Sequence, residues 1–210
     1  MTESHSTTAA VPHDEHVGHA TGGKVAMWLF IAQDGFSFGG LLLAYALLRT
    51  WSHDWPNPQH ILGIKFTAVG TFDLICSSLT MVMAVAAAQR ADRKALVGWL
   101  TATILGGLFF LGMQAYEYTH LVREGIGFTQ GTWEGHPINP LFGTTFFVVT
   151  GFHGCHVTAG VIYLTFILFG AMKGKYTQGG LSYSPVELVG LFWHFVDLVW
   201  ILVFTFIYLL

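Results

Sequence analysis

The chain has 210 residues, of which 53% are hydrophobic and only 10% are charged, with a formal net charge of −3. Soluble domains carry about 25% charged residues, so this composition excludes an ordinary soluble domain. The net charge is small and the sequence holds no block of basic residues, which excludes nucleic acid as a partner.

Residues 1–23 are rich in Thr, Ser, Ala and His and contain no apolar run. We expect a disordered cytoplasmic tail, because such a segment cannot bury enough apolar surface to fold. It lacks the charged first region, the apolar middle and the cleavage pattern of a signal peptide. Residues 24–210 then form one membrane domain.

Five apolar stretches follow, and each is long enough to cross a bilayer as a helix, which takes about 20 residues. They run from Lys24 to Leu48, Ile61 to Ala88, Leu96 to Tyr118, Leu141 to Met172 and Pro185 to Leu210. Segments with Gly and Pro between the stretches predict turns. The fold class is therefore all-α integral membrane, a bundle of five transmembrane helices.

The positive-inside rule predicts the orientation of this bundle. With the N-terminus in the cytoplasm, the inner flanks hold more Lys and Arg than the outer flanks. The inner residues are Lys24, Arg90, Arg93, Lys94, Lys173 and Lys175, and the outer ones are Arg49, Lys65 and Arg123. We therefore expect a cytoplasmic N-terminus and a periplasmic C-terminus.

Acidic residues inside the spans are functional candidates, because ionisable groups are costly in lipid and rare there. An exposed carboxylate at the position of Asp34 costs about 2.5–3.5 kcal/mol on insertion scales. Two interpretations of Asp34 remain open: a protonated acid hydrogen-bonded between helices, and a role in proton transfer or lipid binding. Asp73 is followed by three hydroxyl side chains, from which we expect internal hydrogen bonds. These are Ser77, Ser78 and Thr80.

Gln114 and Glu117 are spaced i, i+3 and share a face of the third span. A cluster of hydrogen bonds between helices is the expectation for this pair.

Histidines and acids occur together in the last two spans. His153 and His156 are spaced i, i+3 in the fourth span, while Glu187, His194 and Asp197 fall along one side of the fifth. Imidazole suits iron and copper, so ligation of haem or copper is one interpretation. The other is that histidines pair with carboxylates in a dry bundle, which needs no metal.

Three segments resemble subunit III of the haem-copper terminal oxidases. The segment from Thr145 to Val157 resembles the family's Phe-Phe-x-x-Thr-Gly-x-His-Gly-x-His-Val block. The segment from Phe192 to Trp200 resembles its Trp-His-Phe-x-Asp-x-Val-Trp block, and the segment from Gln114 to Tyr118 resembles a third signature. The resemblance covers residues 24–210.

The resemblance implies a subunit without a catalytic or redox centre, in which the polar residues hold helices together and bind no metal. Haem and copper are then expected in partner subunits. Subunit I is the expected principal contact, with subunit II, other oxidase subunits, phospholipid and a respiratory supercomplex as further partners. The implied location is a bacterial inner membrane, and the implied role is to stabilise subunit I, to sustain proton uptake and to prolong the life of the oxidase during turnover.

The chain resembles the short bacterial form, which lacks the two N-terminal helices that wall the lipid cleft of the long form. It also has Asp34 where a glutamate is common in the family.

Other functions stay open at this point. Subunit III of a ubiquinol oxidase looks very similar, and a homologue associated with nitric oxide reductase is more remote. A free-standing proton conductor would use Asp34, Asp73 and Glu117. A haem-binding cytochrome would use the histidines.

Overall fold

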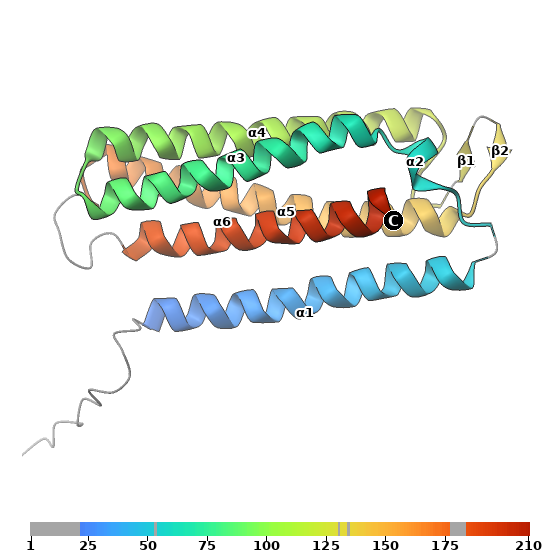
Figure 1. Ribbon diagram of the computed structural model, residues 1–210, viewed down its shortest axis with the longest axis horizontal. Helices are drawn as coiled ribbons and strands as arrows, with labels where there is room; N and C mark the ends of the chain where they lie inside the picture. The colour runs from blue at the N-terminus through green and yellow to red at the C-terminus, as the bar shows by residue number, and fades with distance from the viewer. Residues whose placement is uncertain (1–21, 53, 130, 134, 177–183) are drawn as a thin grey trace, which may run out of the picture.

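The computed structural model describes residues 22–52, 54–129, 131–133, 135–176 and 184–210. Five long helices run side by side along its longest axis (Figure 1). They are α1 (Gly22–Trp51), α3 (Ile64–Gln89), α4 (Arg93–Arg123), α5 (Pro140–Met172) and α6 (Ser184–Val203). Each is long and apolar enough to cross a membrane, α6 together with the π-helix η2 (Phe204–Leu209) that follows it. The five predicted spans are confirmed, while the predicted tail of residues 1–23 lies almost entirely outside the described residues.

Short elements lie at one end of the bundle, beside the C-terminus (Figure 1). They are the single turn α2 (Pro58–Ile61) and the strands β1 (Thr132–Trp133) and β2 (His136–Pro137), which pair antiparallel. The start of α1 lies at the opposite end from the C-terminus, as an odd number of crossings requires.

Local sequence signals account for several helix ends. Asp92 precedes α4, and its side chain accepts a hydrogen bond from the Ala95 N–H at 3.1 Å. Asn139 caps α5 in the same way, with Pro140 at the first helical position, where its missing N–H costs nothing.

The end of α4 lies at Arg123, beyond the Tyr118 that hydropathy predicted. Gly125 follows with a φ of 96°, and the Ile126 N–H bonds the Leu121 carbonyl at 3.0 Å. This is the hydrogen bond of a Schellman motif, for which glycine is preferred because it adopts positive φ without strain. Hydropathy predicts where the chain leaves the apolar part of the membrane, whereas this glycine determines where the helix ends.

Glycines let α4 approach its neighbours closely. A Cβ on Gly107 would lie 2.6 Å from Trp193 Cη2 of α6, and one on Gly106 would lie 2.9 Å from Ser77 Cβ of α3. Lipid offers no hydrophobic driving force between membrane helices, so their association depends on close van der Waals packing. Small residues at the contact allow the two backbones to approach closely enough for it. The tight contact among α3, α4 and α6 forms the core on which the site is built.

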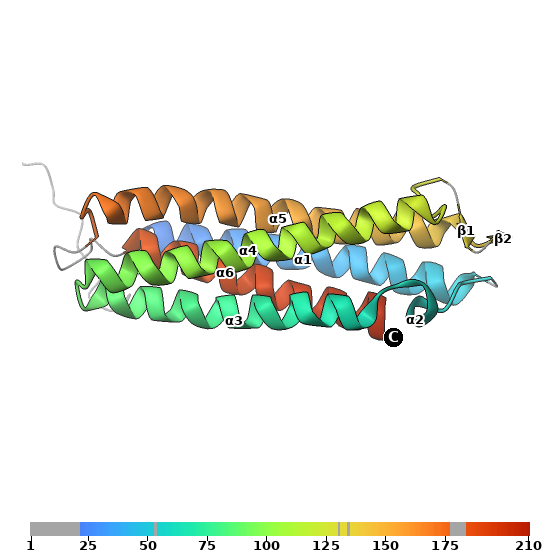
Figure 2. The ribbon, with the colours of Figure 1, turned by 90° about the horizontal axis from the view of Figure 1, so that it is seen from above.

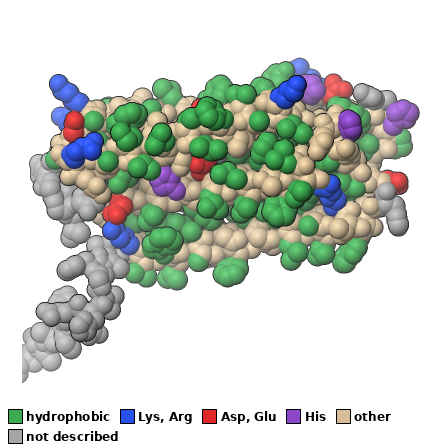
Figure 3. Space-filling model, viewed as in Figure 1, with side chains coloured by type: hydrophobic (Ala, Val, Ile, Leu, Met, Phe, Trp, Pro, Cys, Tyr) green, Lys and Arg blue, Asp and Glu red, His purple; other side chains and the backbone are tan. Residues whose placement is uncertain are grey.

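α1 packs against α5 and α6 through a single stripe. Its buried residues are Asp34, Phe38, Leu42 and Tyr45, which follow helical spacing along one face. The remaining surface of α1 exposes large apolar residues such as Trp28 and Phe36, as expected of a lipid-facing helix. Hydrophobic side chains cover much of the molecule between its ends, where Lys and Arg gather (Figure 3).

Candidate functional site

A histidine and an acid join α1 to α5. His156 Nε2 lies 3.0 Å from Asp34 Oδ2, and His156 Nδ1 lies 2.8 Å from the Phe152 carbonyl oxygen. A carbonyl only accepts hydrogen bonds, so His156 Nδ1 donates to it and Nε2 is the nitrogen that faces Asp34. The contact gives the Asp34 carboxyl group a hydrogen-bond partner inside the span, where lipid offers none.

This geometry fits the first interpretation of Asp34, an acid hydrogen-bonded between helices. It also fits the expectation that His156 pairs with a carboxylate.

Glu117 joins three helical segments near the end of the bundle that holds the C-terminus. The side chain is 7% exposed, and it accepts hydrogen bonds from Thr67 Oγ1 of α3 at 3.1 Å and from the Tyr208 hydroxyl of η2 at 2.8 Å. The hydrogen bonds expected between helices are therefore present at Glu117. Gln114 is buried beside it, but its Nε2 finds no partner among the described residues.

Sequence reasoning missed Tyr208. This residue lies in η2, where the Leu210 N–H bonds the Thr205 carbonyl at 3.1 Å, five residues back. Such π-helical turns shift the register of side chains and often occur at functional positions. Hydrophobic periodicity carries no signal for this change of register.

Two indole groups bind hydroxyls across the contact between α6 and α3. Trp193 Nε1 donates to Ser77 Oγ at 3.1 Å, and Trp200 Nε1 donates to Thr71 Oγ1 at 2.9 Å. The later tryptophan meets the earlier hydroxyl, so the two helices run antiparallel. The sequence signal that was available is the seven-residue spacing of the tryptophans, which places them on one face of a helix.

His194 and Asp197 lie on the same side of α6, as the spacing predicted. His194 Nδ1 lies 2.6 Å from Ser78 Oγ of α3. Asp197 is 6% exposed, and its Oδ1 finds no hydrogen-bond partner in the described part of the chain. The partner of His194 is thus a hydroxyl, and the expected pairing with a carboxylate is wrong for this residue.

His153 is a second correction to that expectation. Its ring is fully buried, and neither nitrogen has a hydrogen-bond partner within the described ranges. The ring centroid lies 4.9 Å from that of Trp200 and 5.8 Å from that of Phe110. An imidazole in this aromatic setting packs as a flat apolar ring, so i, i+3 spacing did not give His153 and His156 the same role.

The expectation for Asp73 is also wrong. Its Oδ2 is buried without a hydrogen-bond partner among the described residues and would lie 3.5 Å from a Cβ on Gly106 of α4. The three hydroxyls that were expected to satisfy it bond elsewhere, because each faces another helix or its own backbone. Ser77 accepts from Trp193, Ser78 contacts His194 and Thr80 contacts Thr103.

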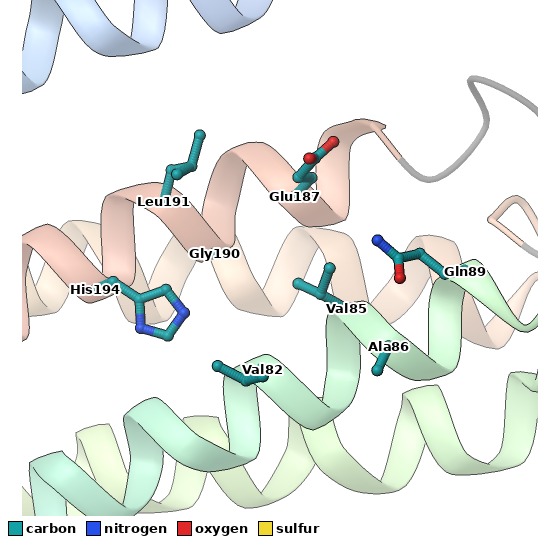
Figure 4. Close-up of a pocket in the computed structure, with 8 residues that line it drawn as sticks. All are labelled: Val82, Val85, Ala86, Gln89, Glu187, Gly190, Leu191 and His194. Atoms are coloured by element: carbon teal, nitrogen blue, oxygen red, sulfur yellow. The ribbon is translucent and has the colours of Figure 1, made fainter.

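Glu187 forms an ion pair with α1, its Oε2 lying 2.9 Å from Lys24 Nζ. Glu187 and His194 both line a pocket of about 310 Å³ between α3 and α6, whose walls include Val82 and Leu191 (Figure 4). Glu187 lies near the start of α6 and His194 lies two turns further along, so the pocket extends from the helix end toward mid-membrane.

The site residues therefore form separate groups. Within the described ranges, no group of three or more His, Cys, Asp and Glu side chains is placed to hold a metal ion. Among the described residues, the arrangement joins helices through hydrogen bonds, including the contact between Asp34 and His156, and through the ion pair between Lys24 and Glu187.

Comparisons with known proteins agree with the motifs. Residues 5–210 match the family described as cytochrome c oxidase subunit III. A cytochrome bo(3) ubiquinol oxidase subunit 3 of Pseudomonas putida is 34% identical over 89% of this chain and 84% of its own length. Cytochrome c oxidase subunit 3 of Corynebacterium diphtheriae is 36% identical over 88% of this chain and 86% of its own. A probable cytochrome c oxidase subunit 3 of Mycobacterium tuberculosis is 37% identical over the same two shares.

Proposed function

The chain belongs to the cytochrome c oxidase subunit III family, and we propose that it is the non-catalytic subunit that stabilises subunit I of a respiratory haem-copper oxygen reductase. It is a multi-pass protein of a bacterial inner membrane, and its family forms part of a multi-subunit oxidase. The observation that carries the proposal is the match over residues 5–210 in a bundle whose membrane acids and histidines contact other helices.

In this proposal the nine polar residues have structural and proton-related roles and no metal ligands are among them. The residues are Asp34, Asp73, Gln114, Glu117, His153, His156, Glu187, His194 and Asp197. Haem and copper reside in partner subunits. Subunit II and membrane lipids are further partners of the chain, and its N-terminus faces the cytoplasm. Subunit III keeps subunit I in its active arrangement and sustains proton uptake during turnover.

The electron donor of the oxidase is a separate question from the role of this subunit. We propose a cytochrome c oxidase, with a ubiquinol oxidase as the second candidate. The second candidate is kept because relatives of both names are similar to this chain. A copper-binding domain in the accompanying subunit II identifies the cytochrome c type, and its absence identifies the quinol type.

Purification through an affinity tag on this chain in mild detergent tests the proposal. We expect a larger haem-bearing subunit to copurify, with the haem absorption bands of an oxidase. The isolated chain is expected to show no Soret band and to pass no protons in liposomes. A Soret band in the spectrum of the isolated chain would identify it as a haem-binding cytochrome, and proton flux in liposomes would identify it as a proton conductor. If the chain purified without any other subunit, the proposal that it is part of an oxidase would be wrong.

A further inference from the structure

The pocket between α3 and α6 has the size and the lining of a small-molecule site. The two helices lie side by side along the bundle (Figure 2). The pocket holds about 310 Å³, with Val85 and Leu191 as apolar walls and the small residues Ala86 and Gly190 leaving room between them (Figure 4). Sites for small ligands have volumes of about 300–1,000 Å³ and are mostly apolar, with a few polar groups that orient the ligand. Val82 also lines the pocket and is 50% exposed, so the pocket opens sideways toward lipid.

His194 places a hydrogen-bonding ring in this pocket. Its Nδ1 lies 2.6 Å from Ser78 Oγ, and its Nε2 has no hydrogen-bond partner among the residues that the structure describes. Figure 4 shows the imidazole extending into the space between the two helices, with one nitrogen directed along the pocket. The side chain is only half-buried, so a molecule in the pocket can reach Nε2.

The depth of His194 selects among the molecules of a membrane. The span from Ser184 to Leu209 has 26 residues, and at 1.5 Å per residue it is about 39 Å long. His194 lies about 15 Å from its first residue, inside the hydrocarbon core, which is about 30 Å thick. The phosphate of a phospholipid stays outside that core, and acyl chains, which do reach the ring, form no hydrogen bond with it.

The charges at the mouth of the pocket favour a neutral ligand. Among the described residues that line it, Glu187 is the one with a formal charge, and its Oε2 lies 2.9 Å from Lys24 Nζ. An anionic head group would meet this carboxylate, whose cation is already engaged. The pocket therefore suits a neutral molecule that carries a hydrogen-bonding head on an apolar tail.

We propose that this pocket binds the ring of an isoprenoid quinone or quinol, with His194 Nε2 bonded to a ring oxygen and the tail leaving past Val82. The contact with Ser78 suits both forms, because a hydroxyl group donates as well as accepts. When Ser78 donates to Nδ1, Nε2 carries the proton and donates to a quinone carbonyl. When Ser78 accepts from Nδ1, Nε2 accepts from a quinol hydroxyl.

The inference goes beyond the proposed function, which assigns no quinone to this chain. It concerns binding alone, so no redox step at His194 is part of it. The site is the same whether the oxidase receives its electrons from cytochrome c or from a quinol.

Photolabelling of the purified complex tests the site. The probe is an azidobenzoquinone with a geranyl tail, which attaches to nearby residues on illumination, and mass spectrometry of the digested chain locates it. We expect label on residues 82–89 of α3 or 187–194 of α6. An excess of decylbenzoquinone is expected to reduce this label several-fold, and the same excess of phosphatidylglycerol is expected to leave it unchanged.

Two tryptophan variants of α3 provide a matched comparison. Val82→Trp fills the pocket from its lipid side, whereas Val69→Trp adds the same side chain to the same helix outside the pocket. The two valines are similarly accessible, at 50% and 55%. We expect Val82→Trp to lower the labelling several-fold and Val69→Trp to leave it unchanged. Equal labelling of the two variants would overturn the inference.

Replacing His194 tests the hydrogen bond itself. His194→Phe keeps a flat ring without nitrogens, and His194→Gln keeps an amide that donates and accepts. We expect labelling to fall several-fold in His194→Phe and to recover in part in His194→Gln. Unchanged labelling in His194→Phe would contradict the contact with Nε2. If His194→Phe does not assemble, as the haem spectrum and the copurifying subunits report, the two tryptophan variants decide.

The other outcomes also overturn the inference. Label absent from both segments would mean that the pocket admits no quinone, and label displaced only by phosphatidylglycerol would make it a lipid site. Label that neither competitor displaces is non-specific. The proposed function fails on a different result, namely that no haem-bearing subunit copurifies, and the labelling is then carried out on the full chain.

Discussion

His156 of α5 faces Asp34 of α1 across the contact between the two helices, with 3.0 Å between Nε2 and Oδ2. α1 otherwise reaches the bundle along one narrow stripe, so this pair is a central polar contact of the first helix with the rest. Because His156 Nδ1 donates to the Phe152 carbonyl, Nε2 is the nitrogen left for Asp34.

Replacing Asp34 tests its pairing with His156. Asp34→Ala leaves His156 Nε2 unsatisfied, and we expect a loss of about 1–3 kcal/mol in the free energy of unfolding. Asp34→Asn keeps an amide that can donate to Nε2 and is expected to lose less. Thermal unfolding of the three chains in one detergent measures the difference, and equal losses would contradict the pairing.

The hydrogen bond between Tyr208 and Glu117 is expected to appear as a coupling energy. In a double-mutant cycle with Tyr208→Phe and Glu117→Ala, each of which removes one partner of the hydrogen bond, groups in direct contact couple by about 0.5–3 kcal/mol. Tyr116→Phe serves as the control, since Tyr116 is largely exposed on the same helix as Glu117. Coupling no greater than that of the control would show that the contact does not stabilise the bundle.

Gly107 tests the close packing of α4. A Cβ there would lie 2.6 Å from Trp193 and 2.7 Å from Val161, so Gly107→Ala is expected to cost about 1–3 kcal/mol, as overpacking does. A Cβ added to Gly112 of the same helix would meet nothing within 4 Å, and Gly112→Ala is expected to be neutral or to stabilise by about 0.5–1 kcal/mol. Unfolding of both variants in the same detergent checks the contrast. Equal effects would mean that the expected clash is relieved elsewhere.

The ion pair between Lys24 and Glu187 is expected to matter little for stability. Both side chains are about one third exposed, at 31% and 29%, so solvent screens their attraction. Glu187→Gln should therefore change the free energy of unfolding by no more than about 1 kcal/mol. The change should shrink further in high salt. A larger loss that persists in salt would assign Glu187 a role beyond this pair.

The sequence predicted the helices better than the contacts between them. Span length and hydropathy identify each membrane-spanning helix, because a segment in lipid must form all its backbone hydrogen bonds internally, as a helix does. Helical spacing placed His194 and Asp197 on one face, and the structure agrees. The side of the membrane on which each terminus lies remains a prediction.

Contacts depend on how each helix is rotated against its neighbours, which spacing within one helix does not report. For this reason spacing along one helix predicts that the nearby hydroxyls bond Asp73, whereas in the structure Ser78 faces His194 and Ser77 faces Trp193. The partner of Glu117 was missed for a related reason, because a π-helix sets the register of Tyr208.

Oxygen consumption by the purified oxidase, with and without this chain, tests most directly the claim that the chain supports the enzyme without catalysing its reaction. The account predicts that oxidase lacking this chain starts at a comparable rate and then loses activity faster during turnover. An absent initial rate would place catalytic machinery on this chain, and an unchanged rate of activity loss would contradict its supporting role.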